Sequence, residues 1–385
     1  MRLQPRREQS LVLHVTTTDI SLDLLLLPQL RAFASAGYEV AAASAPGPHV
    51  DCLVEHGIVH YPLQSFTRSS NPFADLRSVA ELVRLIRRLQ PDVVHTHNPK
   101  PGVIGRLVAR LFGVPLVINT QHGLYAQPGD RRRRRWPVYS AERCAAAFSH
   151  VELVQSYEDV DTLVQRLRVP ADKVRLLGNG VDLARFDPVA VPHHARHQLR
   201  QEWGVGDGDV LIGAVCRLTR EKGIEELLAA FETVREHCPN AHFVVIGPDE
   251  SSDDLAPAIN AARTAGIIFT GLRTDMPECY AAMDLFVTAS WREGVPRSAM
   301  EASAMRLPIV ATDIRGCRQV VDAGTTGTLV PVRHPAALAE AIRELANDAE
   351  LRHRYGTAAQ ARAQADFDDR RVIERTLEAY RLLGH

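Results

Sequence analysis

The stretch from Thr288 to Cys317, TASWREGVPRSAMEASAMRLPIVATDIRGC, says most about how this chain folds. An apolar run from Asp284 to Ala289 (DLFVTA) leads into it and is typical of a buried parallel strand. A glycine-containing loop (WREGVPRS), a helical pattern (AMEASAM) and a second apolar run (LPIVATD) follow. This order predicts a doubly wound α/β sheet, in which the loop after a strand borders the ligand crevice.

Two carboxylates frame this turn, Glu293 in the loop and Glu301 in the helix, eight positions apart. A continuous helix would separate them by about 12 Å, whereas the carboxyl pair of a glycosidase needs about 5 to 9.5 Å. Pro296 disfavours such a continuous helix. We therefore expect Glu293 beside an anion at the helix N-terminus, with Glu301 deeper in the helix. An anion site flanked by acceptors for sugar hydroxyls predicts a nucleotide-sugar site.

The run E-G-V-P-x-x-x-x-E followed by L-P-I-V-A-T-D resembles the E-x7-E signature of retaining glycosyltransferases of family 4. The alternative is a pair of carboxylates that only complements the helix dipole. The resemblance covers nearly the whole chain. It implies the α/β GT-B fold, with two Rossmann-like domains facing a cleft and a final helix that crosses back to the N-terminal domain.

A length of 385 residues suits two domains. The segment VRLLGNGVDLARFDP resembles the family's N-G-V-D-x-x-x-F connection. We expect an acceptor-binding domain over residues 1–186 and a linker over 187–208, which is rich in His, Pro, Arg and Gly. A nucleotide-sugar-binding domain over 209–365 and a C-terminal helix over 366–385 complete the chain. Tyr380 and Leu382 are predicted to form the docking face of that helix.

Composition limits the functions that this chain can perform. The formal charge of −1 argues against wholesale nucleic-acid binding. Six scattered cysteines without a C-x-x-C pair favour a reduced cytosolic setting. No apolar stretch reaches the ~18 residues of a membrane span. We expect a cytoplasmic protein, either free or peripheral on the inner face of the plasma membrane.

One basic segment stands apart from this balanced composition. Five consecutive arginines, Arg131 to Arg135, precede Trp136. Such a run is either a solvated loop or a patch that docks on anionic lipid headgroups, with the tryptophan at the membrane interface. Nucleic acid is a weaker alternative, because no further aromatic residues alternate with the run.

Two cations in the second half flank the loop of a strand–loop–helix unit. Arg217 ends the apolar run and Lys222 opens the helix, so both can converge on one anion. The segment resembles the family pattern G-R-L-x-x-x-K-G, which implies that they bind the donor diphosphate. Further along, a strand ends at Gly247. The loop from Thr270 to Asp275 corresponds to the family's base-binding segment, with Gly271 and Arg273 as candidate contacts.

The first half carries the candidate acceptor side. Its first loop reads TTDIS where the family usually has two glycines, and we expect hydroxyls from Thr18 or Ser21 to substitute. His122 ends the strand PLVINTQH, and the resemblance implies a position beside the donor sugar and phosphate. His95 and His97 end another strand, but no third metal ligand accompanies them in the sequence. The loop HTHNPKPG resembles loops of members that elongate lipid-linked oligosaccharides.

The resemblance implies transfer of a glycosyl group from a nucleotide sugar with retention at the anomeric carbon, and it calls for no metal or cofactor. Arg217 and Lys222 would stabilise the departing diphosphate. Glu301 would bind the ribose, while Glu293 and the main chain of Gly294 and Val295 would bind the donor sugar together with His122. A UDP-sugar, for preference a UDP-N-acetylhexosamine, and a glycan or polyprenyl-diphosphate-linked acceptor are the favoured substrates.

Three other functions are alternatives to a glycosyltransferase. A nucleotide-sugar epimerase of the same fold would convert the donor without an acceptor. A dinucleotide oxidoreductase would need a G-x-G-x-x-G turn after a strand, which the sequence lacks. A carbohydrate-binding module would not need the paired phosphate cations. Tripeptides of the D-x-D kind occur, but none ends an apolar strand at the predicted crevice.

Overall fold

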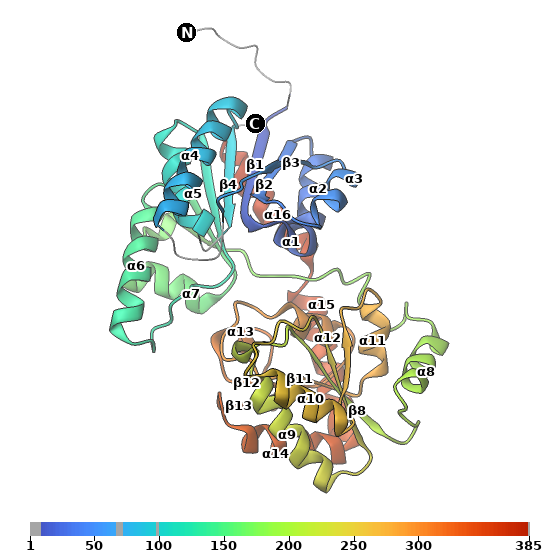
Figure 1. The fold of residues 1–385 in the computed structure, drawn as a ribbon. Coiled ribbons are helices and arrows are strands. Elements are labelled where there is room, and N and C mark those ends of the chain that lie inside the picture. Colours follow the sequence, from blue (N-terminus) through green and yellow to red (C-terminus); the bar gives the residue numbers. More distant parts are fainter. Residues whose placement is uncertain (1–8, 67–71, 98–99, 384–385) are drawn as a thin grey trace. The chain divides into compact units, whose positions relative to one another are not determined.

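The computed structural model describes residues 9–66, 72–97 and 100–383, which divide into two compact units. The first unit comprises Met1–Gly178 with Arg371–His385, and the second comprises Asn179–Arg370. Each unit is built on a parallel sheet with helices on both faces (Figure 1). The predicted α/β architecture with two Rossmann-like domains is thereby confirmed.

The described part of the first unit contains a seven-stranded sheet in the order β3-β2-β1-β4-β5-β6-β7. The strands are β1 (Leu11–Thr18), β2 (Glu39–Ala45), β3 (Val59–Pro62), β4 (Val93–His97), β5 (Leu116–Gln121), β6 (Val151–Val154) and β7 (Val174–Leu176). The helices named below are α2 (Leu27–Ser35), α4 (Pro72–Leu89), α5 (Lys100–Leu111), α6 (Arg132–Ala146) and α16 (Asp369–Tyr380). The order reverses between β1 and β4, so the crevice of a doubly wound sheet falls at their carboxyl ends.

Alternate strand residues of the first unit feed two cores, one on each face of the sheet. Val12 and Val93 pack with α2 and α16, whereas Leu13 and Val94 pack with α4 and α5. This period of two follows from the pleat of a strand buried on both faces.

The described part of the second unit contains a six-stranded sheet in the order β10-β9-β8-β11-β12-β13. Its strands are β8 (Val210–Val215), β9 (Ala241–Ile246), β10 (Ile268–Gly271), β11 (Leu285–Thr288), β12 (Ile309–Thr312) and β13 (Gly327–Val330). Its helices are α8 (His193–Glu202), α9 (Ile224–His237), α10 (Ala256–Thr264), α11 (Met276–Ala282), α12 (Arg297–Ala304), α13 (Arg315–Arg318), α14 (Pro335–Asn347) and α15 (Ala349–Asp366). The switch point lies between β8 and β11, so the loop WREGVPRS begins at the expected edge.

The C-terminal helix returns to the first unit, as predicted. Val372, Ala379 and Tyr380 of α16 are buried in the core beneath β1 and β4. Leu382, the other expected docking residue, is 53% exposed. The helix begins at Asp369, and the residues up to Asp366 belong to α15 of the second unit.

The segment 187–208, which we expected to be a linker, contains α8 and lies within the second unit. Arg200 explains why it is ordered. Its guanidinium donates to the Ala282 carbonyl at the end of α11 at 3.0 Å and to the Asp284 carboxylate at 2.9 Å. These charge-assisted bonds attach α8 to the start of β11.

Among the described helices, none combines the length and apolar character that crossing a bilayer requires.

Candidate functional site

Glu293 and Lys222 meet at the carboxyl edge of the second unit's sheet. The Lys222 Nζ donates to Glu293 Oε1 at 2.5 Å, and the Ser290 hydroxyl donates to the same oxygen at 2.8 Å. Both side chains of the ion pair are less than one-fifth exposed. The loops after β8 and β11, far apart in sequence, therefore share one charged cluster.

Gly223 explains how the two loops come so close. Its φ of 70° lies in the left-handed region, and a Cβ there would lie 2.0 Å from the Ala289 carbonyl oxygen. A side chain at this position would separate the start of α9 from the end of β11. The glycine thus positions the lysine that precedes it.

Arg217 pairs with carboxylates other than Glu293. Its guanidinium binds Glu250 at 2.7 Å and Glu221 at 3.1 Å, and its side chain is 36% exposed. Exposed ion pairs of this kind contribute about 0 to 1 kcal/mol. An arriving diphosphate could replace these partners at little cost, and the assignment of Arg217 to that anion stays a prediction.

Glu301 lies one helix turn inside α12, where it accepts a hydrogen bond at 2.9 Å from the hydroxyl of Tyr280 in α11. Arg297 lies on the same side, with its Nε 4.0 Å from the other carboxylate oxygen. Burial raises the pKa of the Glu301 carboxyl. Tyr280 was missed in the sequence, because an aromatic residue in an apolar helix pattern looks like ordinary core.

The main chain of the E-G-V-P loop is held from two directions. A Cβ on Gly316 in α13 would lie 2.0 Å from the Gly294 carbonyl oxygen, so the first turn of that helix lies directly against the loop. On the other side, the Asn179 amide donates to the Val295 carbonyl at 3.3 Å. A loop fixed in this way can present its backbone to a ligand with little ordering cost.

Gly247 and Gly271 lie together where β9 and β10 end. The Gly247 N–H donates to the Gly271 carbonyl at 2.9 Å, and a Cβ on Gly247 would lie 2.0 Å from the Cys216 carbonyl oxygen. Arg273, expected at the nucleotide base, binds both Asp275 oxygens, at 2.8 and 2.5 Å, and also Glu202 in α8 at 2.9 Å. Its guanidinium thus joins α8 to the loop before α11.

A cavity of about 770 Å³ opens at the carboxyl ends of β1, β4 and β5 in the first unit. Much of its wall is apolar, from residues such as Leu25, Val103 and Val138, and its polar end includes His97 and His122. Thr18 and Ser21 line it as well, with their hydroxyls 3.1 Å apart. The predicted hydroxyl contacts and His122 therefore share one cavity.

Thr17 also lines this cavity and was missed in the sequence. Its side chain is 9% exposed, and its hydroxyl has no hydrogen-bond partner among the described residues. A buried hydroxyl without a partner costs about 1 to 3 kcal/mol. A ligand hydroxyl or phosphate in the cavity would supply the missing partner.

A third histidine, His14, lies near His95 and His97 and was missed in the sequence. One ring nitrogen from each lies within 4.8 Å of the others, and His14 Nδ1 lies 3.2 Å from His97 Nε2, a hydrogen-bond distance. The rings of His95 and His97 stack with centroids 4.5 Å apart, so their in-plane lone pairs run side by side. Their nitrogens hydrogen-bond to one another and to neighbouring hydroxyls, an arrangement that fits hydrogen bonding better than a shared ion.

A buried ion cluster supports the wall of the cavity. Arg106 of α5 is fully buried and contacts Glu142 of α6 at 2.5 Å and Glu152 of β6 at 2.7 Å. Gln121 and Asn119 of β5 donate to these carboxylates at 2.8 Å. The cluster ties two helices to two strands, and no motif in the sequence indicated it.

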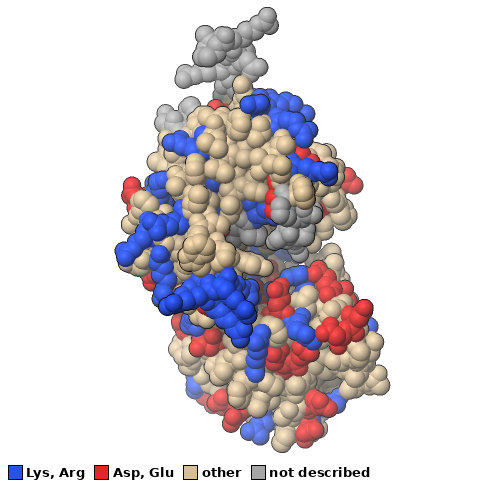
Figure 2. All heavy atoms as spheres, turned by 60° about the vertical axis from the view of Figure 1, so that its left-hand side comes forward, with Lys and Arg blue, Asp and Glu red and all other residues tan. Residues whose placement is uncertain are grey.

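The arginine run forms the start of α6 rather than a loop. Residues 131–134 are exposed, and Trp136 is 73% exposed. Figure 2 shows a concentration of basic side chains on the first unit where this helix lies. Cations at a helix N-terminus oppose the macrodipole by about 0.3 to 1 kcal/mol each, so their clustering here is not explained by helix stability.

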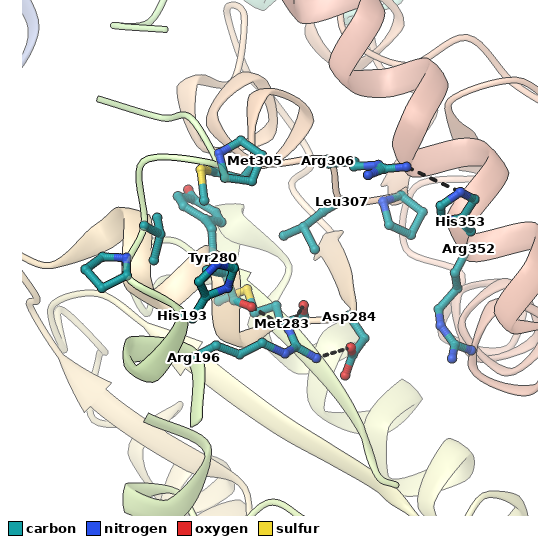
Figure 3. A pocket seen from close by; sticks show the side chains of 15 residues that line it. His193, Arg196, Tyr280, Met283, Asp284, Met305, Arg306, Leu307, Arg352 and His353 are labelled. Carbon is teal, nitrogen blue, oxygen red and sulfur yellow. Dashed lines mark hydrogen bonds and ion pairs between the residues drawn. The ribbon is translucent and has the colours of Figure 1, made fainter. Parts of the chain in front are cut away.

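A second cavity, of about 390 Å³, lies at the opposite edge of the second unit's sheet, where β11 and β12 begin (Figure 3). Its arginines are committed to the protein. Arg196 binds Asp284 and the end of α11, Arg306 bonds His353 and Thr357, and Arg352 bonds the last carbonyls of α14. Parallel sheets bind ligands at their carboxyl ends, so we do not assign the substrates to this cavity.

Comparison with known proteins matches both halves of the chain. A family model described as Glycosyl transferases group 1 matches residues 209–348, and one described as Glycosyltransferase Family 4 matches residues 29–185. The chain is 28% identical over 312 residues to UDP-Gal:alpha-D-GlcNAc-diphosphoundecaprenol alpha-1,3-galactosyltransferase of Escherichia coli, covering 79% of each protein. It is 32% identical over 295 residues to a GDP-mannose-dependent alpha-mannosyltransferase of Mycobacterium tuberculosis, covering 72% of this chain and 70% of that protein.

Solved structures agree on the fold. The crystal structure of Anabaena Alr3699/HepE in complex with UDP and glucose superposes with a TM-score of 0.81 at 19% identity. The match covers 97% of this chain and 99% of that one.

Proposed function

The chain belongs to glycosyltransferase family 4 and has the GT-B fold, and from this premise we propose that it transfers a sugar from a UDP-sugar with retention of anomeric configuration. The favoured sugar is an N-acetylhexosamine, and the favoured acceptor is a glycan carried on a polyprenyl diphosphate. The proposal includes no metal and no cofactor.

The observation that carries the proposal is the contact of Lys222, Glu293 and Ser290 at the switch point of the second unit. A lysine at a helix start is suited to a phosphate, and carboxylates are suited to sugar hydroxyls. We assign Lys222 and Arg217 to the diphosphate and Glu293, with the backbone of Gly294 and Val295, to the donor sugar. Glu301 is assigned to the ribose.

The transfer balances without further reactants. The bond between the anomeric carbon and the diphosphate oxygen breaks, and a bond from that carbon to the acceptor oxygen forms on the same face. The acceptor proton passes to the departing phosphate oxygen. Because charge grows on that phosphate, cations already in place lower the barrier.

The cavity of the first unit is our candidate for the acceptor. Its apolar wall suits the lipid end of a polyprenyl-linked substrate, and Thr17, Thr18 and His122 offer hydrogen bonds to a sugar. The E. coli relative supports this class by its name, which includes a diphosphoundecaprenol acceptor. The His122 ring lines this cavity, and its expected role beside the donor sugar stays part of the proposal.

Nucleotide selectivity tests the proposal first, because the named relatives differ in donor, UDP-galactose in one and GDP-mannose in the other. We expect UDP to stabilise the protein by about 2.7 kcal/mol at 100 times its dissociation constant, with or without EDTA. GDP, ADP and NAD should give smaller shifts. A thermal-shift panel measures this directly.

A response to NAD alone would favour the oxidoreductase and overturn the proposal. An epimerase would convert a UDP-sugar with no acceptor present, so product analysis without acceptor separates that alternative. Proton NMR of the glycoside formed reports its anomeric configuration. A β-linked product from an α-linked donor would exclude retention.

We also propose that the arginine run docks on anionic lipid. Each basic residue near such a surface contributes about 1 kcal/mol. Changing Arg132, Arg133 and Arg134 to glutamine should therefore weaken binding to phosphatidylglycerol vesicles about 100-fold, as measured by flotation. The matched control changes three arginines of the second unit, Arg235, Arg343 and Arg354, in the same way. Equal binding of wild type to neutral vesicles, or an unchanged triple variant, would contradict the proposal.

A further inference from the structure

Four histidines form a row through the first unit. His14 lies in β1, His95 and His97 lie in β4, and His122 follows β5. Because these strands are neighbours in the sheet, the rings gather at one edge, with centroids 5.2 Å apart for His97 and His122 and 5.5 Å for His14 and His97. The row runs from the cavity, which His122 and His97 line, into the core.

Hydrogen bonds join the row end to end. At the cavity end, the Gln155 amide nitrogen lies 3.2 Å from His122 Nδ1, and His122 Nε2 lies 2.9 Å from His97 Nδ1. His97 Nε2 then lies 3.2 Å from His14 Nδ1, and His14 Nε2 lies 3.1 Å from the Tyr380 hydroxyl. Each of these three rings therefore uses both nitrogens within the row.

The row ends in the core at the C-terminal helix. The Tyr380 hydroxyl also lies 2.7 Å from His95 Nδ1, and His95 Nε2 lies 2.7 Å from the Thr120 hydroxyl. Tyr380 is thus the only described residue of α16 that enters the row, and it bonds two of the four histidines.

The first donor sets the direction of every bond. An amide nitrogen only donates, so His122 Nδ1 must accept. A neutral imidazole carries one N–H, so His122 Nε2 donates to His97, and the same logic passes through His14 to Tyr380. The Tyr380 hydroxyl then donates its hydrogen bond to His95 Nδ1, and the His95 Nε2–H donates to the Thr120 hydroxyl. Each hydrogen bond of the row then has one donor hydrogen and one acceptor.

The row is consistent only if the rings are neutral, and burial keeps them so. Burial lowers the pKa of His122 to about 4 and that of His14 to about 3. Burial also lowers the pKa values of His95 and His97 well below their usual value, and the neighbouring histidines add to this effect. At neutral pH, the cavity therefore meets two uncharged imidazoles.

We propose that Gln155 is a positioning residue for the transfer reaction, acting through the histidine row to fix the Nε2–H tautomer and orientation of His122 and His97, while the Tyr380 hydroxyl at the far end of the row fixes the tautomer of His95 alone. The inference rests on the proposed function. The lone pair of His122 Nδ1 accepts a hydrogen bond from the Gln155 amide. A sugar hydroxyl can replace the amide as the donor to this lone pair. A fixed tautomer presents that acceptor every time, and orientation of this kind is worth orders of magnitude in rate.

The test uses the full chain labelled with ¹⁵N-histidine. At pH 7.5, long-range ¹⁵N–¹H spectra should show the Nε2–H tautomer for the four histidines of the row. In Gln155→Glu, a carboxylate accepts where the amide donated, so His122 must carry a proton on Nδ1, and the row should reverse or become charged. In Tyr380→Phe, His122 and His97 should keep their tautomer while His95, without its donor, becomes mixed.

Kinetics complete the test. We expect Gln155→Glu to lower kcat about 10- to 100-fold while the KM for the donor changes little. Gln201→Glu makes the same chemical change at an exposed position of α8 in the second unit and should alter neither the row nor the rate. A purely structural role for Gln155 would lower activity without changing the tautomers.

Two spectral results would overturn the inference, namely an Nδ1–H tautomer at His122 in the wild type or an unchanged row in Gln155→Glu. If Gln155→Glu reversed the row but left kcat unchanged, the inference would be overturned as well. Failure of the proposed function is distinguishable. The wild type could show the expected tautomers but no activity with any nucleotide sugar. That result would contradict both the transfer reaction and the positioning role, and only the hydrogen-bonded row would stand.

Discussion

Replacing Lys222 with alanine should lower kcat by about 100- to 1,000-fold, the range observed when one preorganised donor to a developing oxyanion is removed. Its side chain is 17% exposed, and its ammonium nitrogen is held 2.5 Å from Glu293 Oε1. In the reaction that we propose, negative charge grows on the departing diphosphate, and a lysine at this position gains more in the transition state than in the ground state. Initial rates with a UDP-sugar and a glycan acceptor measure the loss.

Arg220 is the matched control. It lies in the same loop, two residues before Lys222, but it is exposed and pairs with Glu225 and Asp254. Arg220→Ala should change kcat less than about threefold, since solvent screens exposed ion pairs and they contribute little. A similar loss in both variants would show that general charge, rather than this position, matters. Full activity in Lys222→Ala would contradict the diphosphate assignment.

The sequence predicted which loops meet, and the reason is topological. Glu293 and Lys222 follow different strands, but a doubly wound sheet places both strand ends at one edge next to its switch point. The partners of those residues were not predictable. Tyr280 binds Glu301 from a helix that the sequence shows only as an apolar pattern. Arg273 follows the expected strand, but its guanidinium donates to Asp275 and Glu202.

The histidines illustrate the same limit. His95, His97 and His122 stood out because each ends or follows an apolar run, whereas His14 lies inside one and resembles an interior strand residue. Only the pairing of β1 with β4, where His14 lies opposite His95, brings it into the row. Knowledge of the fold type would predict that β1 and β4 are neighbours. It would not predict that His14 lies opposite His95.

The linker expected over residues 187–208 shows how tertiary contacts override composition. The histidines, prolines and arginines of this segment indicated an irregular connection. The arginines of α8 instead bind backbone carbonyls and Asp284 at the end of α11. Such partners lie 82 and 88 residues away in sequence, where local patterns carry no information.

Arg106→Met should destabilise the first unit by about 3 to 5 kcal/mol, the usual cost of removing one partner from a buried ion cluster. The guanidinium is fully buried between Glu142 and Glu152. Without it, two buried carboxylates face each other with only neutral donors, Gln121 and Asn119 among them. Urea denaturation followed by hydrogen exchange in β4 and β5 measures the loss in this unit alone.

Arg110→Met provides the comparison, because Arg110 lies one turn further along α5 and is exposed. Its loss should cost less than about 1 kcal/mol. Adding Glu142→Gln and Glu152→Gln to Arg106→Met should restore much of the stability, since the penalty comes from unpaired charge rather than lost volume. If Arg106→Met cost no more than Arg110→Met, the two carboxylates would have to be protonated or solvated without the arginine, and the cluster could not be what holds α5 and α6 on β5 and β6.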